Sequence, residues 1–543
     1  MSYPLPYEII DETTSERFAY MRVEPAERHK RRTEALVVDL DRLEESDLDE
    51  IMEIAARLGD NRTCLAISTI RCAGVDGGWK VPNFDAFQPL LRKWLRERLD
   101  RGWIYARDRD GQLYPWLVTG LDLVMPDMHA RSTAKPQVRL TGSAYGRSSN
   151  EKSAIGPVRE TWSFEAGDVS RRQVQVILER AGLFGETPEM NAAHDAAEEA
   201  YDEILHEGFA GLYHVTGPAM QLPGYGRNLA EVVGRKVIHD IEAEQLKPYG
   251  EEGETTVFSD RKNPLFLPLP KHRVIEVFDI HSHESYWIST DHLRAHVFDK
   301  TLRQRLVLPE SHQNLLDVLT SEVGAFTSDF IEGKAAGSLI LAKGMPGVGK
   351  TLTAEVYAEL SEKPLYSVHA GNLGTTADSI AKQLDVIFQR ARRWNCVLLL
   401  DEADVFVLRR NEDVERNAIV AAFLRSLEYW EGLLFMTTNR PDDIDEAVLS
   451  RCAAIIDYQP PSPLHAERIW QAMADNFGIE IGADLQRDLL ATFPAITGRD
   501  IKLLLSLSLK VAKSKGADLD IGIVRDCSLF RGLTPVVSTN TPN

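Results

Sequence analysis

Cysteine is scarce in this 543-residue sequence, and no two cysteines are spaced as CxxC. The five that occur, an odd number, are scattered along the chain as Cys64, Cys72, Cys396, Cys452 and Cys527. A set of this kind offers no disulfide framework. We therefore expect free thiols in a reducing compartment.

Long hydrophobic runs are also missing. No stretch approaches the roughly 18–20 apolar residues that a transmembrane helix requires. The first residues, MSYPLPYEIIDETTSE, contain neither the basic segment nor the apolar segment of a secretory signal. These absences predict a cytoplasmic protein that has no membrane partner.

Positive charge is in deficit, because 62 lysines and arginines face 82 carboxylates and the net charge is −20. A surface this acidic repels polyphosphate, which disfavours non-specific binding to nucleic acid. The short basic runs at 29–32 and 92–101 are better interpreted as solvated faces. Hydrophobic residues make up 43% of the chain, enough to build cores for roughly three to four domains.

Residues 1–128 show the periodicities of a small α+β domain, for which we expect a role in partner recognition. One expected helix is capped by Ser46 or Asp47, and another covers 83–100. The expected strands are 35–42, 63–71, 103–107 and 113–124.

The next stretches lack a clear domain pattern. Residues 129–169 are rich in Ser, Gly, Lys and Arg, which favours a linker or mobile loop. Residues 170–308 are expected to contain a helical segment, strongest at 191–208, and a β-hairpin at 274–290.

Two groups of side chains within residues 1–308 could form binding sites, but each has a simpler explanation. His281 and His283 lie in the hairpin turn, yet no Cys or carboxylate cluster completes a metal-ligand set, so a solvated turn is favoured. Trp94, Trp103 and Trp116 could form a binding face, but their helix and strand spacing favours core packing.

Residues 338–360 contain an apolar strand, the loop GMPGVGKT and a helix, which is the GxxxxGK[ST] phosphate loop in its required context. Backbone amides of the loop can point at a phosphate, whereas Pro346 has no N–H and only shapes the loop. Lys350 would neutralise the β- and γ-phosphates of ATP, and Thr351 would bind Mg²⁺. The predicted nucleotide-binding residues are Gly344, Met345, Pro346, Gly347, Val348, Gly349, Lys350 and Thr351.

Two further apolar strands end in polar residues. Val397–Leu400 runs into Asp401 and Glu402, and LLFMTT runs into Asn439. A buried parallel strand carries charge only where it emerges at its carboxyl end, where α/β sheets hold their ligands. We expect Asp401 to hold Mg²⁺, Glu402 to polarise the attacking water as general base, and Asn439 to orient that water.

The order GxxxxGKT, VLLLDEAD, TTNRPDDID and a downstream arginine resembles the AAA+ family, and within it the AAA branch. The resemblance covers residues 305–530. It implies an α/β fold: a phosphate-loop NTPase core at 309–460, built on a parallel sheet with flanking helices, and a small helical lid at 461–530. The α+β region would precede this core, and a disordered tail would follow at 531–543.

The resemblance also implies roles for individual residues. Asn439 matches the γ-phosphate sensor, and Arg451 matches the arginine finger that reaches into a neighbouring subunit. The family usually has two arginines there, whereas Leu-Ser-Arg-Cys supplies one, and Arg440 is the next candidate. Arg499, in ITGRDIKLLL, is a candidate second sensor, with a surface salt bridge as the alternative.

The implied activity is Mg²⁺-dependent hydrolysis of ATP to ADP and phosphate by a homo-oligomer, in this family usually a hexameric ring. The energy would remodel or disassemble an unidentified protein partner. One departure concerns the pore loop, since Gly371-Asn-Leu-Gly374 contains no aromatic residue and Leu373 is its nearest apolar one. A nucleotide-gated assembly switch or scaffold that does not thread its partner is therefore the alternative, and a nucleic-acid motor is less favoured.

Overall fold

The computed structural model divides the chain into two compact units, and each unit is described separately. The first unit comprises residues 1–279 and 284–294, and the second comprises 280–283 and 295–543. No helix among the described residues is long and apolar enough to cross a membrane. The described residues are 2–20, 22, 35–40, 43–72, 79–125, 135–147, 154–169, 171–206, 210–221, 229–240, 245–246, 254–256, 266–321, 337–374, 376–409, 414–428 and 430–536.

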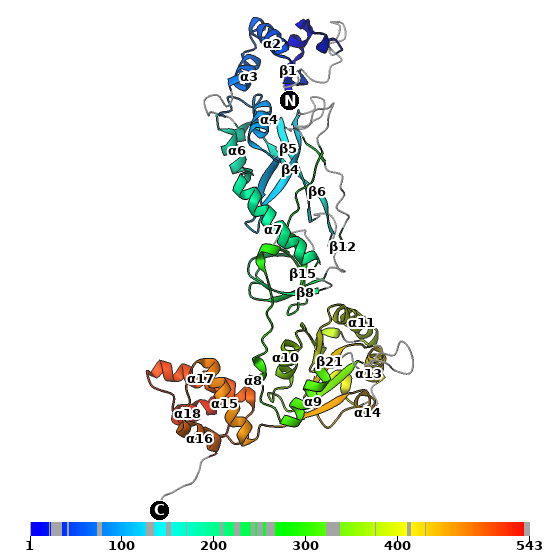
Figure 1. The fold of residues 1–543 in the computed structure, drawn as a ribbon, viewed down its shortest axis with the longest axis vertical. Coiled ribbons are helices and arrows are strands. Elements are labelled where there is room, and N and C mark those ends of the chain that lie inside the picture. The colour runs from blue at the N-terminus through cyan, green and yellow to red at the C-terminus, as the bar shows by residue number, and fades with distance from the viewer. Residues whose placement is uncertain are drawn as a thin grey trace, which may run out of the picture. The chain divides into compact units, whose positions relative to one another are not determined.

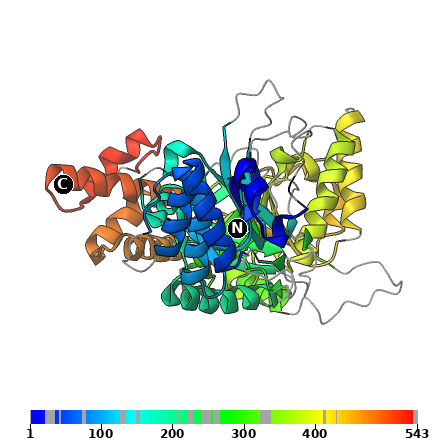
Figure 2. The ribbon, with the colours of Figure 1, turned by 90° about the horizontal axis from the view of Figure 1, so that it is seen from above.

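The first unit begins with a two-stranded antiparallel sheet, β1 (Ser2–Pro6) and β2 (Ala35–Asp39). Three helices accompany it: α1 (Tyr7–Glu12), α2 (Glu45–Leu58) and α3 (Asn61–Cys72). Helices α2 and α3 lie side by side, in blue in Figures 1 and 2. Apolar residues of all these elements share one buried core.

Two expectations for this region are wrong. Residues 63–71 belong to helix α3, and not to a strand, because the buried residues Thr63, Ala66 and Ile67 follow the i, i+3, i+4 spacing of a helix face. Helix α2 is capped by Glu44 and not by Ser46 or Asp47. The backbone N–H of Glu44 donates to Asp47 Oδ2 at 3.0 Å, and the two side chains form a capping box.

A six-stranded sheet forms the middle of the first unit, in the order β12-β6-β5-β4-β3-β7. Strands β3 and β4 have the bounds that the sequence predicts. Helices α4 (Phe87–Arg98) and α6 (Val174–Arg180) contribute to one core with this sheet. The strands are β3 (Trp103–Arg107), β4 (Leu113–Val124), β5 (Gln137–Arg147), β6 (Ala154–Phe164), β7 (Leu183–Gly185) and β12 (Gln245–Leu246).

The structure contradicts the prediction that 129–169 is a linker, because β5 and β6 pair along their whole length. The glycines that made this segment look loop-like have a packing role. A Cβ at Gly142 would lie 2.8 Å from the Cβ of Trp116, and one at Gly146 would lie 2.8 Å from Nδ1 of His272. These glycines therefore let bulky rings lie against the strand. Residues 126–134 and 148–153 lie outside the described residues.

Residues 170–308 contain more sheet than the sequence predicts. The only long helix described there is α7 (Pro188–His206), which covers most of the predicted 191–208. A seven-stranded sheet follows in the order β10-β9-β16-β15-β11-β8-β17, and the predicted hairpin is its β15–β16 pair. Its strands are β8 (Ala210–Val215), β9 (Ala219–Gln221), β10 (Leu229–Ala230), β11 (Lys236–Asp240), β15 (Val274–Asp279), β16 (Ser285–Ser289) and β17 (Leu293–Ala295).

The second unit is built on a five-stranded parallel sheet in the order β19-β20-β21-β18-β22. This is the α/β phosphate-loop fold that the sequence predicts. Strands β20 and β21 are almost entirely buried, as expected for a parallel sheet covered on both faces. The strands are β18 (Ser338–Gly344), β19 (Leu365–His369), β20 (Val397–Asp401), β21 (Leu433–Thr438) and β22 (Ala454–Tyr458).

Helices flank this sheet and form the lid beyond it (Figure 1). Leu306 and Leu308 are buried in the core of the sheet, so the core begins before residue 309. Of the predicted tail, 537–543 lie outside the described residues, while the Val536 N–H donates to the Thr492 carbonyl at 2.9 Å. The core helices are α8 (Leu302–Arg305), α9 (Glu310–Ser321), α10 (Lys350–Leu360), α11 (Ala377–Arg393), α12 (Asp404–Val407), α13 (Val414–Leu427) and α14 (Glu446–Leu449), and the lid helices are α15 (Pro463–Phe477), α16 (Ala483–Thr492), α17 (Gly498–Lys515) and α18 (Ile521–Phe530).

Candidate nucleotide site

The phosphate loop joins the end of β18 to the start of α10. Gly344, Gly347 and Gly349 have φ values of 144°, 85° and 103°, which only glycine adopts without strain. A Cβ at Gly344 would lie 2.2 Å from the carbonyl oxygen of Tyr458. Glycine is thus required at these positions of the loop. The loop brings the N-terminus of α10 to the carboxyl end of β18, where the helix N–H groups can bind a phosphate.

Lys350 occupies the centre of this loop and is 6% exposed. Its Nζ donates to the carbonyls of Gly344 and Met345 at 2.9 and 2.8 Å, and to Asn439 Oδ1 at 2.9 Å. Burial lowers the pKa of Lys350, and the nearby Asp401 carboxylate opposes that shift. The ammonium group is therefore held by three oxygens that an incoming phosphate could replace.

Asp401 ends β20, and two threonines contact it. Thr351 Oγ1 donates to Asp401 Oδ1 at 3.0 Å, and Thr437 Oγ1 donates to the same oxygen at 2.6 Å. A hydroxyl and a carboxylate so close together are the hard oxygen ligands that Mg²⁺ prefers, so Thr351 and Asp401 fit the ion. The sequence analysis did not assign a role to Thr437, although its position at the end of β21 could have indicated that it contacts Asp401.

Glu402 follows Asp401 with a φ of 52°, an uncommon conformation for a residue other than glycine. The Thr437 hydroxyl oxygen accepts from the Glu402 N–H at 2.9 Å, which supports this turn. Oε2 of Glu402 lies 3.3 Å from Nε2 of His369, the last residue of β19. His369 was not recognised in the sequence, because it lies one strand away and belongs to no motif.

Asn439 is positioned by Asp404, which begins α12. Asp404 Oδ1 accepts from the Asn439 N–H at 3.2 Å and from the Thr438 hydroxyl at 2.5 Å. The side-chain oxygen of Asn439 faces Lys350, as described above. Asp404 is the last residue of the sequence DEAD at 401–404, so its position in this motif could have indicated its supporting role.

A cavity of about 730 Å³ connects these groups and extends under the lid. Its volume lies in the range of roughly 300–1,000 Å³ that is typical of small-ligand sites. One part is polar and contains the phosphate loop, Asp401, Glu402 and Asn439. The sequence did not reveal the rest of the lining, which includes Leu306, Leu308, His312, His465, Ile469, Met473 and Lys502.

Arg499 also lines this cavity, at the start of α17. Its backbone N–H donates to the Gly347 carbonyl at 3.1 Å, which joins the lid to the phosphate loop. A Cβ at Gly347 would lie 2.9 Å from the Cβ of Arg499, so close packing requires the glycine. Its role as a second sensor stays a prediction.

Arg451 is not among the cavity-lining residues. Its guanidinium donates to Glu428 at 2.8 Å and to the Ala447 carbonyl at 3.0 Å, and a third of the side chain is exposed. Arg440 is exposed as well. Neither arginine lines the cavity of its own subunit, and a role at a neighbouring subunit stays a prediction.

The segment after β19 forms a short 3₁₀ helix, Ala370–Leu373. Leu373 is 2% exposed, so the nearest apolar candidate for a pore residue is part of the core. In the hairpin turn, Nε2 of His283 lies 2.9 Å from the Ser367 carbonyl oxygen. The structure contains no cluster of metal-ligating side chains among the residues that it describes.

Comparison with known proteins connects this site to a family. The family model described as "ATPase family associated with various cellular activities (AAA)" matches residues 340–460. Human peroxisomal ATPase PEX1 is 31% identical over 176 residues, which are 31% of this chain and 14% of that protein. The uncharacterized AAA family ATPase y4kL of Sinorhizobium fredii is 30% identical over 169 residues, covering 29% of this chain and 50% of that protein.

A further relative is the outer mitochondrial transmembrane helix translocase of Danio rerio, 28% identical over 177 residues, which are 30% of this chain and 46% of that protein. The matched part thus spans at most half the length of these three relatives. It includes the phosphate loop, the acidic strand end and the asparagine that meet in the cavity. The second unit of this chain therefore contains an AAA domain, which the family model matches over residues 340–460.

Proposed function

We propose that this chain is a Mg²⁺-dependent ATPase that works as a homo-oligomer and uses hydrolysis to remodel or disassemble a protein partner. The observation that carries the proposal is the convergence of Lys350, Asp401, Glu402 and Asn439 on one cavity with the phosphate loop. These residues come from the carboxyl ends of two parallel strands, β20 and β21, and from the start of α10.

In the proposed reaction, Lys350 and the loop amides bind the β- and γ-phosphates. Thr351 and Asp401 would hold Mg²⁺, which supplies positive charge for the phosphate oxygens. Glu402 takes a proton from the attacking water, and Asn439 orients that water toward the γ-phosphate. Arg499 contacts phosphate from the lid, which would make closure of the lid sensitive to the nucleotide.

The positions of two arginines support an oligomer, because neither Arg440 nor Arg451 lines the cavity of its own subunit. Arg451 lies two residues after α14 and does not line the cavity of its own subunit. A neighbouring subunit, in a hexamer for instance, would provide a cavity that Arg451 can reach. The free thiols described in the structure favour the cytoplasm as the place where this ring works.

The name of one relative favours a protein partner, because it is called a transmembrane helix translocase. The first unit, which the AAA match does not reach, would recognise that partner. A nucleotide-gated assembly switch is the second candidate. It is favoured by the buried Leu373 and by the lack of an aromatic residue in the segment after β19.

Glu402→Gln tests the enzyme and captures its partner. The variant should keep ATP bound while turnover falls about 10²–10⁴-fold, because the water loses its base. Phosphate release and nucleotide content are measured on the purified chain, and proteins retained with ATP are identified by mass spectrometry. The exposed Glu446→Gln, on α14, is the matched control and should hydrolyse ATP as the wild type does.

The two candidate functions give different results in this experiment. A remodelling enzyme should retain a partner in the Glu402→Gln variant, and that partner should stimulate wild-type turnover. A switch should hydrolyse slowly, retain no partner and change its oligomer size with nucleotide. Near-wild-type turnover by Glu402→Gln would show that the general base has been assigned to the wrong residue.

A further inference from the structure

The first unit contains a recess that no AAA motif accounts for. It has a volume of about 410 Å³ and lies on the six-stranded sheet. Residues of β3, β4 and β6 line it, together with the segment that leads into β15. All of it belongs to the first unit, so it is separate from the nucleotide cavity. Its lining consists of Ala106, Arg107, Asp108, Tyr114, Trp116, Arg147, Pro157, Val158, Arg159, Glu160, Trp162, Met220, His272 and Val274.

Aromatic rings form one side of this recess. Trp116 and Trp162 meet edge to face, with ring centroids 5.7 Å apart, and the ring of His272 lies 4.6 Å from that of Trp116. Both tryptophans are partly exposed. Trp94 and Trp103, by contrast, are buried in the cores, as the sequence analysis favoured for all three tryptophans. Trp116 therefore presents aromatic surface that the core does not use.

Three arginines and two carboxylates, Asp108 and Glu160, line the recess. Arg147 Nη1 contacts Met220 Sδ at 3.1 Å, and Arg159 pairs with Glu254 at 2.8 Å. Arg107 is an exposed residue, and its guanidinium carbon lies 5.3 Å from the centroid of the Phe184 ring. Since Arg159 is already paired with Glu254, Arg107 and Arg147 are the guanidinium groups that the recess offers to an anion.

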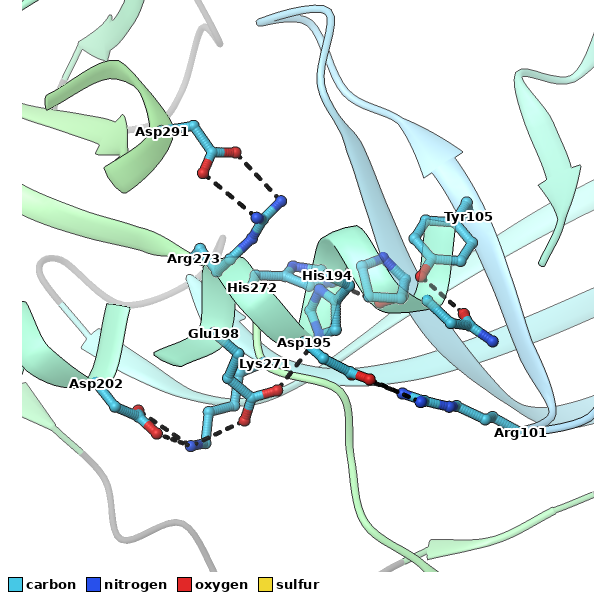
Figure 3. A network of polar contacts seen from close by, with 12 residues as sticks. Arg101, Tyr105, His194, Asp195, Glu198, Asp202, Lys271, His272, Arg273 and Asp291 are labelled. Carbon is cyan, nitrogen blue, oxygen red and sulfur yellow. Dashed lines mark hydrogen bonds and ion pairs between the residues drawn. The ribbon is translucent and has the colours of Figure 1, made fainter. Parts of the chain in front are cut away.

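Ion pairs hold the wall of the recess in place (Figure 3). Lys271 binds Glu198 and Asp202 of α7 at 3.0 and 3.1 Å, and Arg273 binds Asp291 at 3.2 Å. These pairs flank His272, whose Nε2 lies 2.9 Å from the Pro115 carbonyl oxygen. Because His272 is fixed from both sides, the aromatic side of the recess is formed before any ligand arrives.

We propose that this recess binds a planar aromatic anion about the size of a mononucleotide, which stacks on Trp116 or Trp162 and pairs its negative group with Arg107 and Arg147. Rings and guanidinium groups together recognise this chemistry, because the rings offer π-faces and the guanidinium groups offer forked donors. The many charged lining residues disfavour an apolar peptide side chain. The small volume disfavours a polymer.

Titration calorimetry of the full-length chain tests this proposal, with ADP present to fill the nucleotide cavity. The probes are 5′-AMP and indole-3-acetate. Each has a flat ring system and an anionic group, but the first is a nucleotide with a phosphate and the second is an indole with a carboxylate. At least one should bind with one site per chain. Arg107→Ala should weaken that binding about 10-fold or more, as expected for loss of a charged hydrogen bond.

Trp162→Ala should weaken the binding by a similar factor, because stacking is lost. Circular dichroism shows whether this variant is folded, and the exposed Arg107 provides a second test that does not alter the core. Arg109→Ala is the matched control, since Arg109 is two residues from Arg107 but does not line the recess. Absence of binding by both probes, or binding that Arg107→Ala leaves unchanged, would overturn the proposal.

Discussion

At the scale of single residues, Lys350 is the side chain whose surroundings indicate nucleotide binding best. Its ammonium group is almost fully buried, and burial lowers its pKa. Its three oxygen partners are carbonyl and amide oxygens, and none of them carries a full charge. A phosphate would bring a negatively charged oxygen into direct contact with this buried cation.

Lys350→Ala should therefore abolish detectable ATP binding, because it removes the charge that offsets the β- and γ-phosphates. Fluorescence titration with a labelled ATP analogue measures the affinity directly. Lys343→Ala is the matched control, because Lys343 lies on β18 and outside the cavity. An unchanged affinity in the Lys350→Ala chain would show that this side chain does not hold the phosphates.

At the scale of secondary-structure elements, His272 joins the segment before β15 to strand β4. Burial lowers the pKa of His272 to about 4, and its hydrogen bond with the Pro115 carbonyl opposes that shift. An unfolded histidine titrates near 6.5, so the unfolded chain binds the proton more readily than the folded one. The stability from this neutral histidine is therefore complete above pH 6.5 and is lost as the pH falls toward 4.

Between pH 7.5 and pH 5, His272 should lower the free energy of unfolding of the first unit by about 2 kcal/mol. Urea unfolding followed by tryptophan fluorescence at several pH values measures this loss. His272→Gln keeps a donor for the Pro115 carbonyl but cannot titrate, so its pH dependence should be weaker by that amount. The exposed His281→Gln should behave as the wild type, and equal pH profiles for all three chains would contradict the argument.

At the scale of the whole molecule, one subunit does not contain every group that the proposed reaction needs. Arg451 pairs with Glu428 on its own subunit and does not line the cavity. An arginine finger provided by a neighbouring subunit raises the rate by roughly 10³–10⁵ in other phosphate-loop enzymes. The proposed oligomer can therefore be tested by separating the finger from the phosphate loop.

Arg451→Ala should be inactive alone, and so should Lys350→Ala. Mixed oligomers contain some interfaces that pair an intact phosphate loop with an intact finger, so mixing should restore part of the phosphate release. The recovery should disappear at dilutions at which the oligomer dissociates. If mixed oligomers form and remain inactive, Arg451 does not act across an interface, and Arg440 becomes the next candidate.

The sequence by itself determined the phosphate loop, the acidic strand end and the parallel strands around them. Each of these is a short local pattern, in which neighbouring residues decide the backbone and buried strands read as continuous apolar runs. Strands β3 and β4 and helix α4 were predictable for the same reason. The lid helices were predictable from the resemblance.

Only the tertiary structure decided the features that depend on distant residues. Residues 137–147 looked like a linker because their glycines lower local hydrophobicity, and the need for those glycines comes from Trp116 and His272 elsewhere in the chain. His369 approaches Glu402 because two parallel strands pair in register, and Leu306 reaches the nucleotide cavity from before the phosphate loop. Such contacts arise from packing between segments far apart in sequence, and no local periodicity records them.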